Sequence, residues 1–148
     1  MKGLSIRQPW AEAILHHGKD IENREWKTSS FRGLLLIHAS KTNRPSARAD
    51  WDTARAISGQ DIRPLDQLDR GGLVGMCRVV DVTETSFSPW RLPDCLYLVL
   101  ADPIALPFVP FKGALGFFEV SGNELGAHLP AYLAARNTLL AKEREAGR

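Results

Sequence analysis

Short apolar runs, separated by polar breaks and turn residues, follow one another along most of this chain, and this pattern predicts mainly strands. Residues 33–39 are apolar almost throughout, which is typical of a buried strand. Further strands are predicted over residues 2–6, 73–82, 95–101 and 115–120. Residues 103–111 are extended but hold three prolines, which predicts a loop or a sheet edge, because proline donates no hydrogen bond to a neighbouring strand.

Three other segments have the apolar spacing of helices. Residues 9–17 carry apolar side chains at intervals of three and four, so they predict a short amphipathic helix, which Gly18 ends. Two further helices are predicted over residues 45–57 and 129–143. We expect the first of these two to be capped close to Asn43 or Arg44.

Strands outnumber helices, and regular helices do not separate them, so the pattern predicts an α+β domain and not a doubly wound fold. We expect a small, mostly antiparallel barrel or curled sheet flanked by helices, with the C-terminal helix added to it. The 148 residues suit one domain and are enough to bury a sizeable core.

The composition, with 44% hydrophobic and 24% charged residues, excludes an intrinsically disordered chain. No apolar run in the sequence approaches the ~18 residues of a membrane span, so we expect no membrane insertion. The first residues contain no apolar leader, which predicts a cytoplasmic protein, and we expect a monomer. The sequence has only two cysteines and no recognisable metal-binding or glycine-rich motif. We therefore expect no metal site and no cofactor.

Charge is distributed unevenly along the chain. Residues 1–50 hold nine Lys or Arg and five Asp or Glu, a net charge of +4. Residues 51–148 hold ten and twelve, a net charge of −2. A basic first third on a nearly neutral body predicts one positive face.

Polar and aromatic side chains concentrate in residues 4–41, and two of them share one strand face. Residues 20–26 alternate poorly for a strand, yet Glu22 and Arg24 are two apart and point to the same side of any extended segment. A guanidinium held by a carboxylate is rigid and still offers N–H donors to a phosphate or a carbonyl. The same spacing also suits an ion pair that only orients a loop.

Three blocks of this region read LSIRQPWA at residues 4–11, GKDIENREW at residues 18–26 and RGLLLIHASK at residues 32–41. Together they resemble the signature of the ASCH domain, the activating-signal-cointegrator homology domain, a branch of the PUA-like superfold. The resemblance continues to Gly75 and to PFKGALGF at residues 110–117. It implies that residues 1–124 form a PUA-like β-barrel and that residues 125–148 are a helical extension packed on it or projecting from it.

The resemblance also implies a cleft where the first helix meets the barrel, with RNA or a modified nucleobase as its ligand. The predicted ligand-binding residues are Arg7, Gln8, Trp10, Arg24, Trp26, His38, Ser40 and Lys41. Tryptophan stacks on unpaired bases, cations contact phosphates, and glutamine can read a base edge. Trp10, Trp26 and His38 suit a place in the core equally well.

Two enzymatic alternatives use the same cleft, with Lys19 and Glu22 as candidate catalytic residues. Small members of the wider family are amidohydrolases that deacetylate N4-acetylcytidine, which implies a lysine at position 19, a threonine at position 22 and a distant glutamate. Glu22 replaces that threonine and cannot act as a hydroxyl nucleophile, and Glu84 and Glu119 are both candidates for the distant glutamate. The other alternative is a metal-independent ribonuclease, in which Lys19, Arg24, His38 and Ser40 stabilise phosphoryl transfer.

Overall fold

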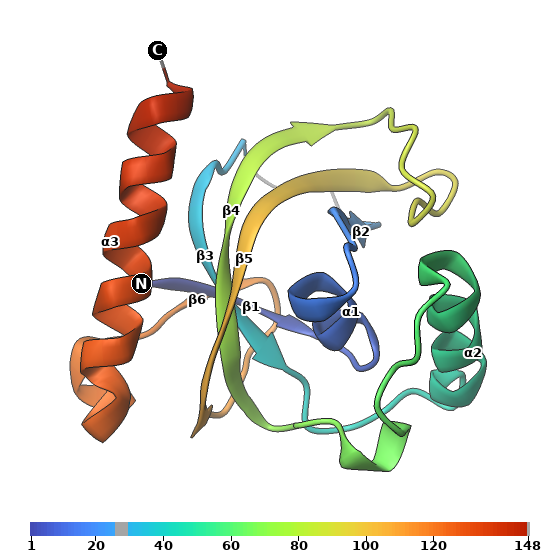
Figure 1. The fold of residues 1–148 in the computed structure, drawn as a ribbon, viewed down its shortest axis with the longest axis horizontal. Coiled ribbons are helices and arrows are strands. Elements are labelled where there is room, and N and C mark those ends of the chain that lie inside the picture. Colours follow the sequence, from blue (N-terminus) through green and yellow to red (C-terminus); the bar gives the residue numbers. More distant parts are fainter. Residues whose placement is uncertain (26–29, 148) are drawn as a thin grey trace.

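The structure is a computed structural model that describes residues 1–25 and 30–147 (Figure 1). Trp26, one of the predicted ligand-binding residues, lies outside the described residues. Within the described part, six strands form one sheet in the order β2-β5-β4-β3-β1-β6. These strands are β1 (Lys2–Ile6), β2 (Ile21–Arg24), β3 (Gly33–Ala39), β4 (Gly72–Thr83), β5 (Leu96–Pro110) and β6 (Phe117–Glu119).

Most neighbours in this sheet are antiparallel, but β1 and β3 run parallel. Leu4 lies opposite Ile37, so the two strands end at the same edge of the sheet. The backbone N–H of Ser40, just after β3, donates to the carbonyl of Ile6 at 3.0 Å. Arg7 and Ser40, which are far apart in the sequence, therefore emerge side by side.

The sheet curls because its two longest strands are paired irregularly. The register between β4 and β5 shifts between Leu73 and Gly75, between Met76 and Arg78, and between Val79 and Asp81. An extra residue at such a bulge bends the strand and increases its twist. At Gly75 a Cβ atom would lie 2.6 Å from both the Ile104 carbonyl oxygen and the Leu15 Cδ2, so glycine lets the first helix sit directly on β4.

β5 is one continuous strand, whereas the sequence predicts a strand over residues 95–101 and a separate extended segment over residues 103–111. The predicted break is wrong, because the bulged pairing with β4 accommodates the irregular backbone. β2 pairs only with residues 96–99, so among the described strands the proline-containing half of β5 is paired on one side alone. The prolines therefore lie at a sheet edge, as predicted.

The helices flank the sheet on both faces (Figure 1). They are α1 (Trp10–His16), α2 (Ala47–Ser58) and α3 (Leu129–Ala146), with short 3-10 turns η1 (Leu65–Gln67) and η2 (Gly122–His128). α2 begins later than predicted, because Ser46 takes the capping position in place of Asn43 or Arg44. A residue before proline is disfavoured in the helical conformation, which keeps Arg44 outside the helix.

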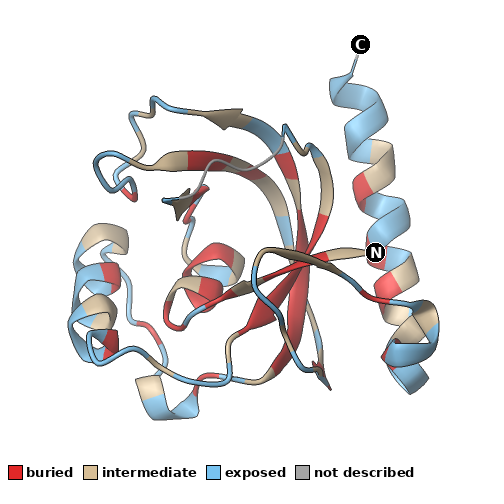
Figure 2. Ribbon diagram, turned by 180° about the vertical axis from the view of Figure 1, so that it is seen from behind, coloured by how far each residue is buried: buried red, intermediate tan, exposed pale blue. Residues whose placement is uncertain are grey.

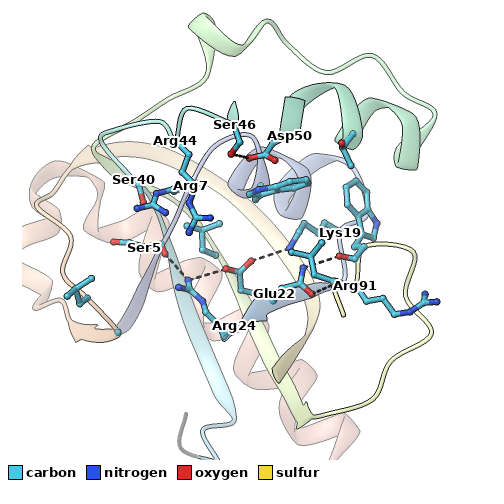
Figure 3. A pocket seen from close by; sticks show the side chains of 18 of the residues that line it. Ser5, Arg7, Lys19, Glu22, Arg24, Ser40, Arg44, Ser46, Asp50 and Arg91 are labelled. Atoms are coloured by element: carbon cyan, nitrogen blue, oxygen red, sulfur yellow. Dashed lines mark hydrogen bonds and ion pairs between the residues drawn. The ribbon is translucent and has the colours of Figure 1, made fainter. Parts of the chain in front are cut away.

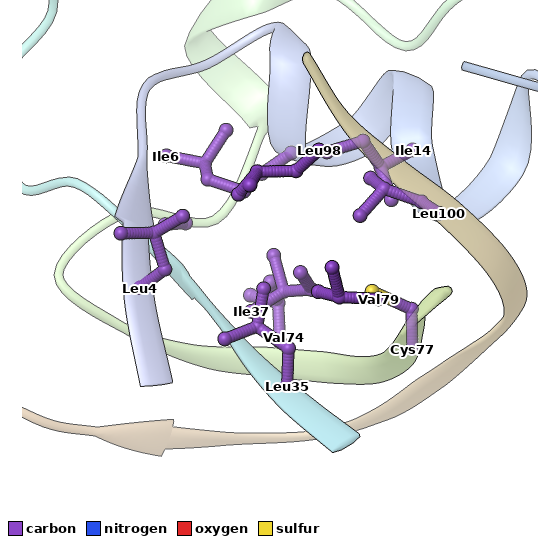
Figure 4. Packing of buried hydrophobic residues seen from close by; sticks show 12 residues of the cluster. Leu4, Ile6, Ile14, Leu35, Ile37, Val74, Cys77, Val79, Leu98 and Leu100 are labelled. Carbon is purple, nitrogen blue, oxygen red and sulfur yellow. The ribbon is translucent and has the colours of Figure 1, made fainter. Parts of the chain in front are cut away.

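The inside of the curl is filled by one apolar cluster (Figure 4). Successive residues of β3 point to opposite faces, so Leu35 and Ile37 join this inner cluster while Leu36 joins a second cluster on the outer face. Both faces of β3 are buried, which explains the continuous apolar run at residues 33–39. Ile14 of α1 packs into the inner cluster from above the sheet.

The outer face of the sheet is covered by α3, which buries Tyr132, Ala135 and Leu139 there. Figure 2 shows the opposite side of this helix as mostly exposed. The predicted fold class is confirmed: the chain is an α+β protein with a curled, mostly antiparallel sheet, flanking helices and a C-terminal helix. None of the helices in the described part combines the length and the apolar character needed to span a membrane.

Candidate nucleotide-binding cavity

A cavity of about 1110 Å³ opens beside α2 at the mouth of the curl (Figure 3). Its walls come from the end of β1, from β2, from α2 and the segment before it, and from the loops around residues 90–92 and 114–117. The charged residues that line it are Arg7, Lys19, Glu22, Arg24, Arg44, Asp50 and Arg91. Among the described residues, cations therefore outnumber carboxylates in this lining by five to two, which favours an anionic ligand.

Glu22 joins two cations in the cavity wall. Its Oε1 atom lies 3.1 Å from Lys19 Nζ, and its Oε2 atom lies 3.1 Å from Arg24 Nη2. Lys19 Nζ also donates to the Ile21 carbonyl at 2.5 Å, and Arg24 Nη2 donates to the Ser5 carbonyl at 2.8 Å. The Lys19 and Glu22 side chains are only 2% and 10% exposed. This Lys19–Glu22–Arg24 array is thus held rigidly and carries one positive charge in excess.

Local backbone geometry explains how the array forms. Gly18 has a φ of +74°, a conformation that glycine adopts without strain, and this turn reverses the chain after α1. The Lys19 N–H then donates to the Ala13 carbonyl at 3.1 Å, which ties the turn to the helix. In the extended β2, Glu22 and Arg24 point to the same face, so the pairing expected from their spacing is present.

Ser5, whose carbonyl accepts a hydrogen bond from Arg24, also forms a side-chain hydrogen bond with His38. His38 Nε2 donates to the Phe111 carbonyl at 2.6 Å, so Nδ1 is the acceptor for the Ser5 hydroxyl at 2.9 Å. Gly113 closes over the pair, since a Cβ atom there would lie 2.2 Å from Ser5 Oγ. His38 is 2% exposed and points into this packed layer, outside the cavity lining.

Burial lowers the pKa of His38 below its ordinary value of 6.5, and the hydrogen bond to the Phe111 carbonyl only partly offsets this effect. Below pH 6.5 the unfolded chain therefore binds a proton that the folded chain does not. We expect the free energy of unfolding to decrease as the pH falls through 6.5 toward the lowered pKa. Urea unfolding between about pH 7.5 and pH 5.5 measures this slope, and His38→Gln should reduce it. If His38→Gln leaves the slope of unfolding free energy against pH unchanged, other groups cause the pH dependence.

Two tryptophans form an aromatic wall at the Lys19 side of the cavity. The rings of Trp10 and Trp90 meet edge to face with centroids 6.4 Å apart, and Lys19 Nζ lies 5.8 Å from the Trp10 ring centroid. Asn23 fixes the loop that carries Trp90, because it donates to the Trp90 carbonyl and accepts from the Leu92 N–H, each at 3.0 Å. Trp10 is half-buried, so part of its surface is open to a ligand.

The structure brings together many, but not all, of the residues that the sequence singles out. Those that line the cavity are Arg7, Trp10, Lys19, Glu22, Arg24 and Ser40. Gln8, His38 and Lys41 do not line it. Gln8 is buried, with its amide donating to the Asp69 carbonyl at 2.9 Å and accepting from the Glu12 N–H at 3.0 Å, so it stabilises the start of α1. Lys41 is exposed on the surface.

Several lining residues are missed by the sequence reasoning. Arg44, Asp50, Trp90 and Arg91 come from segments that carry no motif, and they reach the cavity because α2 and the loop before β5 fold over it. The net charge of +4 in residues 1–50 is the one available signal, since Arg44 belongs to that segment. Nothing local marks Trp90 or Arg91.

Of the groups considered for enzymatic roles, Lys19, Glu22, Arg24 and Ser40 line the cavity, whereas the candidates for the distant glutamate do not. Glu84 and Glu119 are both absent from the lining, and Glu119 lies 3.7 Å from Lys2 Nζ and 3.5 Å from the N-terminal amino group. Within the described parts of the chain, no group of three or more His, Cys, Asp or Glu side chains could hold a metal ion.

Fold and cavity together define a small α+β domain with a cation-rich site at the mouth of a curled sheet. The chain matches the family model of the ASCH domain over residues 4–107, and it belongs to this family. It is 30% identical over 94 residues to Activating signal cointegrator 1 of Homo sapiens, and 31% identical over 94 residues to the Mus musculus protein of the same name. Each match covers 62% of this chain but only 16% of the relative, so the similarity concerns one segment of much longer proteins.

Proposed function

We propose that the cavity binds an unpaired base of RNA or a modified nucleobase. The observation that carries this proposal is the Lys19–Glu22–Arg24 array, in which Lys19 and Glu22 are buried, beside the Trp10–Trp90 wall. RNA-binding domains commonly recognise single-stranded bases by stacking on aromatic rings and by hydrogen bonds to the base edge. The cavity offers both kinds of group within one space. The ASCH family membership supports the same ligand class.

The array supplies the hydrogen-bonding part of this recognition. Lys19 uses two of its three donors on Ile21 and Glu22, and Arg24 has five N–H donors on a planar fork. Nucleobase carbonyl oxygens accept from such donors, and the Glu22 carboxylate can accept from an exocyclic amino group. Because the array is already ordered by its internal ion pairs, binding costs little side-chain entropy.

The tryptophans supply the stacking part. A stacked base contributes about 1–3 kcal/mol, largely regardless of its identity. The exposed part of the Trp10 ring is the platform, and Trp90 supports it at the edge. Stacking therefore gives affinity, while the array selects the base.

Binding without chemistry is the function that the geometry favours. Glu22 stands where the deacetylases have threonine, and both of its oxygens are engaged by cations. Neither Glu84 nor Glu119 reaches the cavity, and His38 points into the packed layer. Incubation with N4-acetylcytidine and with RNA should therefore leave both intact by chromatography. Turnover that is lost in Lys19→Ala would favour the enzymatic alternatives.

Arg24→Ala should weaken the binding of a short single-stranded RNA or of N4-acetylcytidine, whichever binds more tightly, by about tenfold or more. A hydrogen bond from a charged donor contributes about 1.5–3 kcal/mol, and 1.4 kcal/mol is a factor of ten. Isothermal titration calorimetry measures the affinity. The control is Arg32→Ala, which removes an equal charge from an exposed pair with Asp81 away from the cavity. A folded Arg24→Ala protein that binds as tightly as Arg32→Ala would refute the proposed site.

A further inference from the structure

The end of the cavity opposite the tryptophan wall has a separate chemistry. Figure 3 shows Arg7, Arg44 and Ser40 together at one end, with Lys19 and Arg91 at the other. The Ser40 N–H donates to Ile6 at 3.0 Å, which places Ser40 beside the start of Arg7. The Arg44 carbonyl accepts from the Ala47 N–H at 3.0 Å, so the first turn of α2 holds the Arg44 backbone in place.

Both arginines at this end are exposed, and neither has a side-chain hydrogen bond or an ion pair within the described residues. Other arginines are engaged: Arg24 with Glu22, Arg63 with Glu12, and Arg78 with Asp102. Two guanidinium groups that face one space repel each other, and an anion between them removes that repulsion. A phosphate suits the position, because guanidinium N–H groups match its oxygens in pairs.

The volume of the cavity also favours a ligand larger than a single base. Pockets for ligands of drug size have volumes of about 300–1,000 Å³, and this cavity measures about 1110 Å³. A base against Trp10 and the array leaves the arginine end unfilled. The other carboxylate of the lining, Asp50, is held by a hydrogen bond from Ser46 at 3.1 Å. Its negative charge repels a phosphate, which favours a phosphate position at the two arginines over one beside Asp50.

We propose that Arg7, Arg44 and Ser40 form a phosphate subsite, so that the cavity takes a nucleotide in preference to a nucleoside. This inference rests on the proposed function, because the base must occupy the tryptophan end. It goes beyond that function in naming the phosphate as a recognised group and Arg44 as a residue that determines specificity.

The test compares affinities of the full chain, by calorimetry, for the common ribonucleosides and N4-acetylcytidine with those for their 3′- and 5′-monophosphates. We expect at least one monophosphate to bind about tenfold more tightly than its nucleoside. Arg7→Gln and Arg44→Gln should each abolish most of this gain, so that in each variant the monophosphate binds about as tightly as its nucleoside. Arg48→Gln is the matched control, because Arg48 is an exposed arginine of α2 outside the lining.

The outcomes separate the two proposals. Equal affinity for nucleosides and monophosphates, or a gain that survives in both arginine variants, overturns the phosphate subsite but keeps the base site. If Arg48→Gln loses as much of the affinity gain as the two cavity variants, the gain comes from the overall charge of the protein. This outcome also overturns the subsite. Absence of binding by every nucleoside and monophosphate overturns the base site and the subsite together.

Discussion

Replacing Glu22 by alanine is expected to lower the free energy of unfolding by about 3–5 kcal/mol, because it leaves a buried ammonium without its counter-ion. Lys19 is 2% exposed, and Glu22 supplies its carboxylate partner at 3.1 Å. Without that carboxylate, Lys19 Nζ keeps the Ile21 carbonyl as its hydrogen-bond acceptor but has no counter-ion at 3.1 Å, and Arg24 loses its ion pair with Glu22. Urea unfolding followed by circular dichroism measures the change.

Two comparisons show whether burial is the cause. Arg32→Ala breaks an ion pair with Asp81 in which both side chains are about half exposed, and it should cost at most about 1 kcal/mol. The double variant Lys19→Met with Glu22→Leu removes both charges and should cost clearly less than Glu22→Ala alone. A loss in Glu22→Ala no larger than that in Arg32→Ala would mean that the buried pair does not stabilise the fold.

Tyr132→Ala is expected to lower the free energy of unfolding by about 3–5 kcal/mol, because it opens a cavity between α3 and the sheet. Tyr132 is fully buried, and its hydroxyl donates to the Pro107 carbonyl at 2.7 Å. Burial also raises the pKa of this hydroxyl to about 12, so it stays protonated as a donor. Tyr132→Phe keeps the ring and loses only the hydrogen bond, which should cost about 1 kcal/mol.

The control on the same helix is Arg136→Ala, an exposed position that should change stability by no more than about 0.5 kcal/mol. Deletion of residues 129–148 extends the test. If residues 1–124 form a domain by themselves, as we propose from the ASCH resemblance, the truncated chain keeps a cooperative unfolding transition. It should still be less stable, because Leu36, Met76 and Val109 lose the cover of α3. A Tyr132→Ala protein as stable as Arg136→Ala would show that α3 contributes little.

Residue types and their spacing along the chain determined several features of this protein. The apolar run at residues 33–39 predicted a buried strand. The prolines in residues 103–111 limited that segment to a loop or a sheet edge, because proline donates no hydrogen bond to a neighbouring strand. The spacing of Glu22 and Arg24 specified a shared face, because side chains two residues apart in a strand point to the same side. The three motif blocks identified the family that the comparisons show.

Only the tertiary structure decided which side chains share the cavity. Gln8 sits in a motif beside Trp10, yet its amide is used by Asp69 and Glu12, whereas Arg44 and Trp90 carry no motif and line the site. Such choices depend on contacts between segments that are tens of residues apart, and no local pattern encodes them. The parallel ends of β1 and β3 place Arg7 beside Ser40, and the curl of β4 and β5 brings the Trp90 loop over both β2 and α1. Residue types and spacing thus determined the elements and the array, while packing across the sheet determined the shape and the charge of the space they enclose.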